Sequence, residues 1–224
     1  MHMQKTAGTA LWRRLGSQFA PGELYPGPGD GSPPTTTVSV PHLLAVWRQR
    51  SPEIRVVTGH FPFCVGGLLG GGFTTFTVLR DPVERTLSFL RHHREVTPDD
   101  AHRSLEEIYD DPVRRELVCN HMVKMLSLDV HEMTDGALTP VAFTDARVRA
   151  AQGRLEELDV VGFQDDFEAF CTELTHRYGW DLGPPVFMNR TSPAPASSSL
   201  RRRIERDNQA DLELFAHALS LRHI

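Results

Sequence analysis

The chain has 224 residues, 40% of them hydrophobic, and a formal net charge of −5 at pH 7. This length and apolar content suffice for one good hydrophobic core, and no linker divides the sequence, so we expect one domain over residues 1–224. The negative charge argues against nucleic acid as a partner, and the absence of both a long apolar run and a leader pattern predicts a cytoplasmic protein with no membrane span.

The first half of the chain predicts helices and short strands separated by glycine- and proline-rich loops. In chain order we expect a helix over 8–18, a loop over 21–40, a helix over 41–50, a strand over 55–58, a glycine-rich loop over 65–72 and a strand over 73–79. The loop over 21–40 cannot bury a core, so we expect it to be flexible or to fold over a substrate. The glycine-rich loop has no following helix of the dinucleotide-binding kind, which favours a mobile active-site loop over a Rossmann fingerprint.

The second half predicts more helices around one further strand. In chain order we expect helices over 82–92, 104–109, 112–126 and 145–158, a strand over 160–163, a helix from Asp165 or Asp166 to Tyr178, a flexible Pro/Ser-rich loop over 184–199, and helices over 200–208 and 211–221. The alternation of helices with short apolar strands predicts an α/β fold with a parallel sheet.

The residues that open the first helix predict an anion-binding loop. Side chains are small over residues 6–9, so an anion can approach backbone N–H groups at the positive end of a helix dipole. Lys5 adds a mobile positive charge, and the two threonines add hydroxyl donors. No G-x-x-x-x-G-K-[ST] motif occurs in the chain, which argues against an ordinary nucleotide triphosphatase. The candidate phosphate-binding residues of this loop are Lys5, Thr6, Ala7, Gly8, Thr9 and Ala10.

A second candidate site follows the strand predicted over 73–79. Arg80 comes directly after this strand, and Ser88 lies two turns into the next helix. The guanidinium group of Arg80 and the hydroxyl of Ser88 can together hold a phosphate by charge-assisted hydrogen bonds. The alternative for Arg80 is a structural ion pair with Asp81 or Glu84, and Ser88 taken alone carries little information.

In this order and at this spacing, the two motifs resemble those of sulfotransferases that use 3′-phosphoadenosine-5′-phosphosulfate. Residues 2–11 are similar to the family's 5′-phosphosulfate loop, H-x-x-K-T-[GA]-G-T, and residues 79–88 to its 3′-phosphate site. The subgroup that they resemble most contains the heparan sulfate 2-O- and 6-O-sulfotransferases and many bacterial relatives. Weaker matches at 57–61, 120–126, 159–167 and 188–192 extend the resemblance over most of the chain. It implies a P-loop-NTPase-like parallel sheet flanked by helices.

The amino-terminal end departs from the family's pattern. In the family the lysine loop follows a buried central strand, which delivers it to the carboxyl edge of the sheet. Here Met1, His2, Met3 and Gln4 alone precede Lys5. We therefore expect the first strand to be truncated from this chain. The alternative is a loop that hangs from an unanchored terminus, where disorder concentrates.

The resemblance also implies roles for the candidate residues. Lys5 would neutralise the oxygen that leaves the sulfuryl group, while the backbone amides of residues 6–9 hold the other oxygens. Arg80 and Ser88 would hold the 3′-phosphate of the cofactor. His60, which follows a strand and a glycine, would accept the proton of the acceptor hydroxyl. The catalytic candidates are therefore Lys5 and His60, and the implied acceptor is a carbohydrate or a secondary metabolite.

Other residues carry weaker expectations. His2 is expected to shape the edge of the loop, and His92 and His93 to lie on a helix surface. Contacts of Asn120, Asn189 and Arg190 with the cofactor are compatible with the sequence, as are roles on a helix surface or in a loop. The three cysteines, Cys64, Cys119 and Cys171, form no C-x-x-C pair, which predicts free thiols, and sulfuryl transfer needs no metal.

Two other functions remain open at the level of sequence. One is a nucleotide-binding module without turnover, and the other is a kinase of a small molecule, which would share the anion-binding loop. The missing Walker motif and the pairing of Arg80 with Ser88 weigh against a kinase. The identity of the acceptor depends on the long loops and cannot be deduced from the residues.

Overall fold

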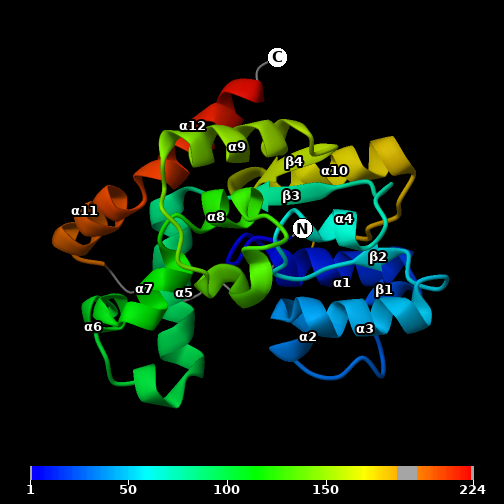
Figure 1. The fold of residues 1–224 in the computed structure, drawn as a ribbon, viewed down its shortest axis with the longest axis horizontal. Helices are drawn as coiled ribbons and strands as arrows, with labels where there is room; N and C mark the ends of the chain where they lie inside the picture. Colours follow the sequence, from blue (N-terminus) through cyan, green and yellow to red (C-terminus); the bar gives the residue numbers. More distant parts are fainter. Residues whose placement is uncertain (1, 186–195, 223–224) are drawn as a thin grey trace.

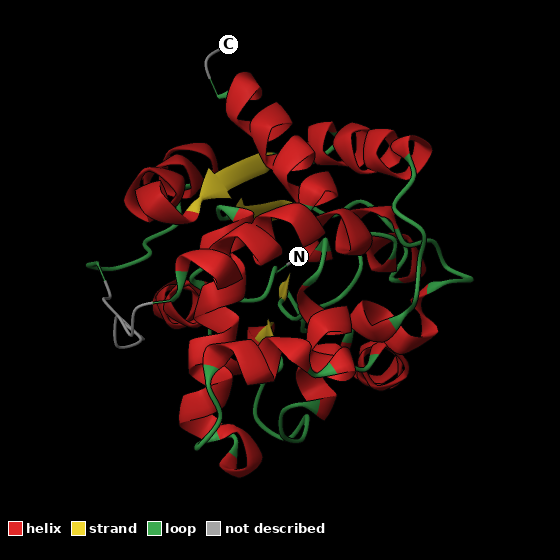
Figure 2. Ribbon diagram, turned by 90° about the vertical axis from the view of Figure 1, so that its left-hand side faces the viewer, coloured by secondary structure: helices red, strands yellow, loops and turns green. Residues whose placement is uncertain are grey.

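A computed structural model of the protein describes residues 2–185 and 196–222. It has a mixed α/β fold in which helices surround a few short strands (Figure 2). Strand β1 (Leu24–Tyr25) pairs in parallel with β2 (Val56–Val57), and β3 (Phe76–Leu79) pairs in parallel with β4 (Val160–Phe163). The expectation of parallel strands is confirmed. The expectation of one sheet is wrong for the described residues, because the two pairs form separate two-stranded sheets.

Helices make up most of the molecule (Figure 1). The α-helices are α1 (Gly8–Gln18), α2 (Thr35–Val38), α3 (Val40–Arg50), α4 (Val65–Leu68), α5 (Pro82–Val96), α6 (Leu105–Asp110), α7 (Pro112–Val118), α8 (His121–Ser127), α9 (Asp145–Glu156), α10 (Phe167–Tyr178), α11 (Ser198–Asp207) and α12 (Gln209–Leu221). Short 3₁₀ helices are η1 (Pro21–Glu23), η2 (Pro98–Asp100), η3 (Met133–Leu138) and η4 (Gln164–Asp166). No helix of the described residues is long and apolar enough to cross a membrane.

The helix expected over 112–126 is wrong in one respect, because it is two helices. Asn120 separates α7 from α8 with a left-handed φ of 46°, a conformation that asparagine adopts more readily than most residues. The carboxylate of Asp211, on α12, then accepts hydrogen bonds from the backbone N–H groups of Met122 and Val123 at 3.0 and 2.8 Å. A residue far along the sequence therefore caps α8, which local pattern cannot reveal.

The segment over 21–40 is not a plain loop, because it contains η1, β1 and α2. Its centre is held by Asp30, whose buried carboxylate accepts a hydrogen bond from the N–H of Gly27 at 2.7 Å. The same carboxylate pairs with Arg50 on α3 at 2.6 Å. Of the second expected loop, over 184–199, residues 186–195 lie outside the described part of the chain.

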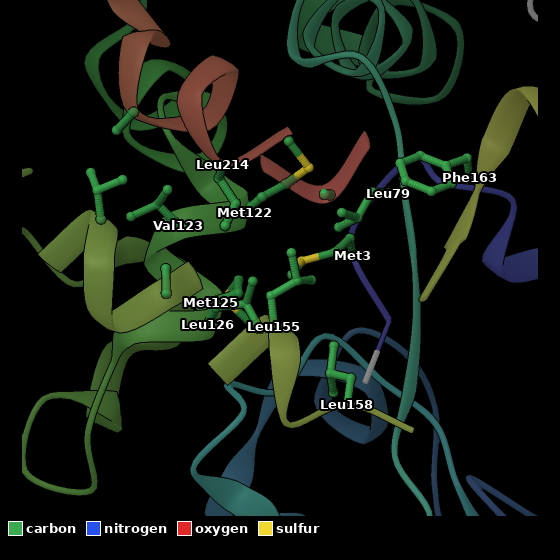
Figure 3. Close-up of a cluster of buried hydrophobic side chains, with 14 residues drawn as sticks. Met3, Leu79, Met122, Val123, Met125, Leu126, Leu155, Leu158, Phe163 and Leu214 are labelled. Atoms are coloured by element: carbon green, nitrogen blue, oxygen red, sulfur yellow. The ribbon is translucent and has the colours of Figure 1, made fainter. Parts of the chain in front are cut away.

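The residues before Lys5 are anchored in the structure. The side chain of Met3 is fully buried among Leu79, Leu155 and other core residues (Figure 3). The backbone N–H of His2 donates to the carbonyl of Gly59, just after β2, at 3.1 Å. The described chain thus starts between β2 and β3, in line with its position in Figure 1.

Candidate functional site

A cavity of about 940 Å³ lies at the carboxyl ends of β2, β3 and β4. Its walls come from the residues before and within the first turn of α1, from α2, from the residues after each of the three strands, and from α5 and α7. The side chains that carry chemistry there are His2, Gln4, Lys5, Thr9, His60, Arg80, Ser88, His92, His93, Asp165, Asp166 and Glu168. Of the residues predicted from sequence, Lys5, Ala7, Gly8, Thr9, Ala10, His60, Arg80 and Ser88 all line this one cavity.

The loop before α1 has an unusual backbone. Lys5 and Ala7 both adopt left-handed φ values, 67° and 66°, while Thr6 between them does not. Alternation of this kind turns successive N–H groups toward one side and forms an anion-binding concavity. Ala7 caps α1 without a side-chain hydrogen bond, and within the described chain no group accepts from the N–H groups of residues 6–10. These donors are therefore free for an anion at the helix N-terminus.

Gly8 is required here by its neighbour His2. A Cβ atom added at Gly8 would lie 1.7 Å from Nε2 of His2, so the imidazole ring occupies the space of a side chain. Burial, followed by the charge of nearby His60, lowers the pKa of His2 well below its ordinary value. His2 is therefore a neutral ring that fills the space beneath the loop, and its Nε2 is buried without a partner.

Lys5 and Arg80 bring two positive charges to the same cavity. Nη1 of Arg80 donates to the backbone carbonyl of Lys5 at 3.2 Å. Burial, together with the neighbouring charge of Arg80, lowers the pKa of Lys5 to about 8. Neither side chain forms an ion pair with a carboxylate in residues 2–185 or 196–222, and Nε of Arg80 is buried without a partner. Two unpaired cations in one recess favour an anionic ligand.

The acids that could have paired with Arg80 are engaged elsewhere. Asp81 caps α5 by accepting the N–H of Glu84 at 2.9 Å. The carboxylate of Glu84 pairs with Arg201 at 2.7 Å. Ser88, 6% exposed, lines the cavity, and its hydroxyl has no partner among the described residues. The guanidinium group of Arg80 and the hydroxyl of Ser88 are therefore both available to a ligand.

The structure places Thr6 differently from the other residues of the loop. Its side chain is fully buried, and its hydroxyl donates to the carbonyl of Met3 at 2.9 Å. The hydroxyl that was expected to donate to a ligand thus stabilises the loop. Of the two donors of Thr6, the backbone N–H is the one left without an acceptor in the described chain. The side chain of Thr9 is exposed on the cavity wall.

His60 enters the cavity from the residue after Gly59. Its Nδ1 lies 3.1 Å from the carbonyl of His2, and since a carbonyl only accepts, Nδ1 carries the proton. Nε2 then has a free lone pair. Burial lowers the pKa of His60, and the charge of Lys5 acts in the same direction. A neutral imidazole with Nε2 unprotonated is the form that can accept a proton from a hydroxyl.

Two further histidines, which were expected on a helix surface, are half-buried on α5 and also line the cavity. His92 and His93 extend from α5 beside Ser88 and Phe89, one helical turn further on. Burial lowers the pKa of both, to about 4 for His93. The spacing of four residues from Ser88 to His92 is the signal that could have identified this face.

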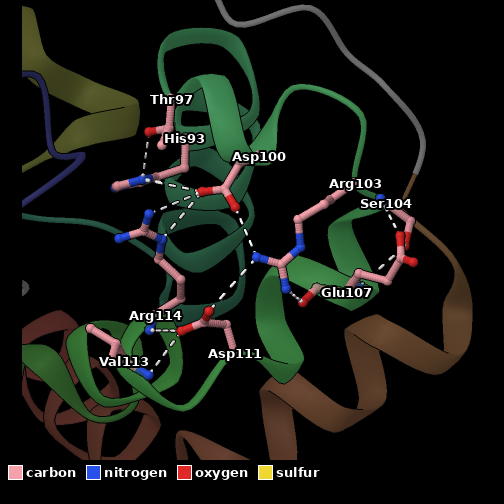
Figure 4. A network of polar contacts seen from close by, with 9 residues as sticks. All are labelled: His93, Thr97, Asp100, Arg103, Ser104, Glu107, Asp111, Val113 and Arg114. Atoms are coloured by element: carbon pink, nitrogen blue, oxygen red, sulfur yellow. Dashed lines mark hydrogen bonds and ion pairs between the residues drawn. The ribbon is translucent and has the colours of Figure 1, made fainter.

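A polar network holds His93 in place (Figure 4). Nδ1 of His93 lies 3.2 Å from the hydroxyl of Thr97, one turn further along α5. Beside it, the buried carboxylate of Asp100 accepts from Arg103 at 2.9 Å and from Arg114 at 3.2 Å. The bond to Arg114 joins η2, which follows α5, to α7.

Another part of the cavity wall is formed by residues 164–168, which follow β4. Glu168 pairs with Arg14 of α1 at 2.7 Å. Arg14 is nearly buried and also donates to the carbonyls of Leu182 and Gly183 at 3.0 and 3.1 Å. Arg14 thus ties this part of the cavity wall to α1, which begins at the anion-binding loop.

Some expected contributors lie elsewhere. The glycine-rich stretch 65–72 contains α4 and lines a different, smaller cavity, so it does not border the candidate site. Asn120 is nearly buried in a hydrogen-bond pair with Asn208 and does not line the cavity. Asn189 and Arg190 lie outside the described residues.

Comparisons with known proteins do not identify a family. No protein-family model matches the chain, and no curated protein is significantly similar to it. The cavity joins a helix N-terminus with free donors, two unpaired cations, a free hydroxyl and a neutral imidazole.

Proposed function

We propose that the protein is a sulfotransferase that moves a sulfuryl group from 3′-phosphoadenosine-5′-phosphosulfate to an acceptor hydroxyl. One observation carries the proposal: the two sequence motifs, 75 residues apart, meet in a single cavity where Arg80 donates to the carbonyl of Lys5. Such a cavity offers separate positive groups to two phosphate-like ends of one ligand. His60 adds a base to the same cavity.

The residues present fit this cofactor. The concave backbone over residues 5–7 and the free N–H groups at the start of α1 suit a tetrahedral anion. Arg80, with Nε unpartnered, and Ser88, with a free hydroxyl, suit a second anion. The cavity volume, about 940 Å³, is in the upper part of the range for small-molecule sites.

In this proposal the cofactor supplies an electron-poor sulfuryl group and a good leaving phosphate, and the chain supplies position and charge. Lys5 and the N–H groups of residues 6–10 stabilise the negative charge that grows on the leaving side, an effect worth about 3–4 kcal/mol per preorganised donor. Nε2 of His60 accepts the proton of the acceptor hydroxyl, while its Nδ1–H stays on the carbonyl of His2. The imidazole ring of His2 lies 4.6 Å from that of His60 and fills the space beside Gly8. His2 therefore holds both the loop and His60 in position.

The parallel strands and a site at their carboxyl ends are compatible with a P-loop-NTPase-like sulfotransferase of the heparan sulfate 2-O- and 6-O-sulfotransferase-like group. We take the acceptor to be a carbohydrate or secondary metabolite and the protein to act in the cytoplasm.

Thermal unfolding with added nucleotides tests the proposal. Adenosine 3′,5′-bisphosphate at 100 times its dissociation constant should stabilise the fold by about 2.7 kcal/mol, or raise the melting temperature by about 5–10 °C. Adenosine 5′-monophosphate, which lacks the 3′-phosphate, is the matched control and should raise it much less. Transfer of radiolabelled sulfate to a panel of polyols then measures turnover.

Each alternative has its own outcome. A shift with ATP and Mg²⁺ but none with the bisphosphate would contradict the sulfotransferase proposal and favour a kinase. A rise in melting temperature with the bisphosphate, but no sulfate transfer to any acceptor by protein whose His60 is confirmed to be unmodified, would favour a binding module. A shift of equal size with the bisphosphate and the monophosphate would remove the proposed role of Arg80 and Ser88.

A further inference from the structure

The wall of the candidate site next to His60 is formed by α2. The backbone N–H of His60 donates to the carbonyl of Thr37 at 2.7 Å, and both residues line the cavity. The candidate base therefore has α2 as its direct neighbour. When an acceptor hydroxyl reaches Nε2 of His60, the part of the acceptor that surrounds this hydroxyl lies close to α2.

The side chains with which α2 borders the cavity are mainly apolar. Pro34 and Val38 are one helical turn apart, so they share a face of α2, and both line the cavity together with Pro33. Thr36, between them, is fully buried and anchors α2 to the rest of the molecule. Val38, by contrast, is 44% exposed. It therefore offers its apolar surface to the cavity and not to the core.

Other elements continue this apolar wall. Phe89 of α5, Leu117 of α7 and Phe167 of α10 line the same cavity. All three side chains are buried or half-buried where they meet it. Sites for small organic molecules combine apolar walls of this kind with a few polar groups that fix the orientation of the ligand. The cavity thus has room and surface for an apolar skeleton beside the groups that suit phosphates.

The charged side chains of the cavity leave no cation for an anionic acceptor. Among the described residues that line it, Lys5 and Arg80 are the positive ones, and the proposed function assigns both to the phosphates of the cofactor. The others are the acids Asp165, Asp166 and Glu168, of which Asp165 is exposed and has no partner in the described part of the chain. The histidines of the cavity are neutral, because burial lowers their pKa values. A carboxylate or sulfate on an acceptor would meet repulsion without a compensating ion pair.

We propose that the acceptor is an uncharged alcohol or phenol whose hydroxyl is carried on an apolar ring or chain, and that Pro34 and Val38 of α2 select it. This inference rests on the proposed function and narrows its acceptor. The apolar skeleton packs on α2, the hydroxyl gives its proton to Nε2 of His60, and the hydroxyl oxygen takes the sulfuryl group from the phosphate that leaves. Uronates and sulfated sugars are disfavoured, because specificity also comes from what a site repels.

Sulfate transfer to a matched pair of acceptors tests this acceptor class. 4-Ethylphenol and 4-hydroxybenzoate share the ring and the hydroxyl, and they differ in carrying an apolar group or a carboxylate. The kcat/KM for 4-ethylphenol should be higher by about 10-fold or more. A disaccharide that contains a uronate should be sulfated no better than 4-hydroxybenzoate. Equal kcat/KM for the two phenols, or a preference for either carboxylate, would overturn the proposal.

A variant of α2 tests whether Val38 makes the selection. Val38→Lys should raise KM for 4-ethylphenol by about 10-fold and bring the kcat/KM values of the two phenols together, while nucleotide affinity stays unchanged. Val130→Lys is the matched control, because Val130 is also 44% exposed but does not line the cavity. Val38→Thr, which keeps the shape of the side chain without a charge, should raise KM in the same direction by less. A KM in Val38→Lys equal to that of Val130→Lys would contradict the role of α2.

Binding measurements separate a failure of this inference from a failure of the proposed function. No change in melting temperature with adenosine 3′,5′-bisphosphate would contradict both. With the bisphosphate bound, calorimetry measures acceptor binding without turnover, and 4-ethylphenol should bind about 10-fold or more tightly than 4-hydroxybenzoate. Binding of the bisphosphate without binding of 4-ethylphenol would overturn the acceptor class and leave the nucleotide site standing.

Discussion

Nη1 of Arg80 donates a hydrogen bond to the backbone carbonyl of Lys5 at 3.2 Å, which fixes the residue after β3 against the loop before α1. The bond uses one of the guanidinium's donors and leaves Nε buried without a partner. Arg80 therefore supports the loop and still offers a donor to a ligand. Its substitution should affect binding more than folding.

Arg80→Ala should weaken the binding of adenosine 3′,5′-bisphosphate by about 10- to 100-fold, because a hydrogen bond to a charged group contributes about 1.5–3 kcal/mol. Isothermal titration calorimetry measures the dissociation constant. Arg201→Ala, which removes an exposed arginine paired with Glu84, is the matched control and should leave binding unchanged. Equal affinity in both variants would argue against a phosphate contact at Arg80.

The affinity for the same ligand should fall as pH rises through about 8, the pKa to which burial and the charge of Arg80 lower Lys5. The protonated amine is the form that binds the anion, and it predominates below this pKa, so affinity is highest there and declines above it. The ligand phosphates are already ionised from pH 7.5 upward, which separates the two effects. Titrations from pH 7.5 to 9.5 measure the decline. Lys5→Arg, which stays charged throughout, should flatten the curve.

His60→Ala should reduce the transfer rate by about 10²- to 10⁴-fold, the usual contribution of a general base, with little change in nucleotide affinity. His176→Ala, on the exposed face of α10, is the control. Because burial lowers the pKa of His60, its base form persists as pH falls to the ordinary imidazole value, and the rate should decline only below that. A rate that already halves near pH 7 would contradict this assignment.

Gly8→Ala should destabilise the protein by about 1–3 kcal/mol, since the new methyl group would collide with the ring of His2. Gly16→Ala in the same helix has no atom within 4 Å and should instead stabilise it by about 0.5–1 kcal/mol. Urea unfolding measures both. Adding His2→Ala to Gly8→Ala should recover part of the loss. A Gly8→Ala variant as stable as Gly16→Ala would show that His2 moves aside freely.

Local pattern predicted the elements whose causes are local. The bounds of α1 follow from small residues before Leu11 and from an apolar face continued by Leu15, and the bounds of β4 from a short β-branched run. Strand β1 was missed because its two residues lie inside a Pro/Gly-rich stretch and gain their pairing from β2, over thirty residues away. Separation of the strands into two sheets is likewise a matter of distant pairing.

The candidate site likewise has features that local sequence predicts and features that depend on tertiary packing. Lys5, Arg80, Ser88 and His60 were predicted because each stands in a recognisable motif or directly after a strand, and the structure brings them to one cavity. The partner of the Thr6 hydroxyl depends on how the loop folds back on Met3. The role of His92 and His93 depends on which face α5 turns inward, and that is decided by tertiary packing.

Through Arg14, helix α1 links the anion-binding loop to the segment at Leu182 and Gly183. The helix begins at the anion-binding loop. About 9 Å along its axis, Arg14 donates hydrogen bonds to the carbonyls of Leu182 and Gly183. A helix transmits axial displacement with little loss over so short a length. Any ligand that displaces the first turn of α1 therefore also displaces the chain at Gly183, which does not line the cavity, so that ligand binding and the position of this segment are coupled.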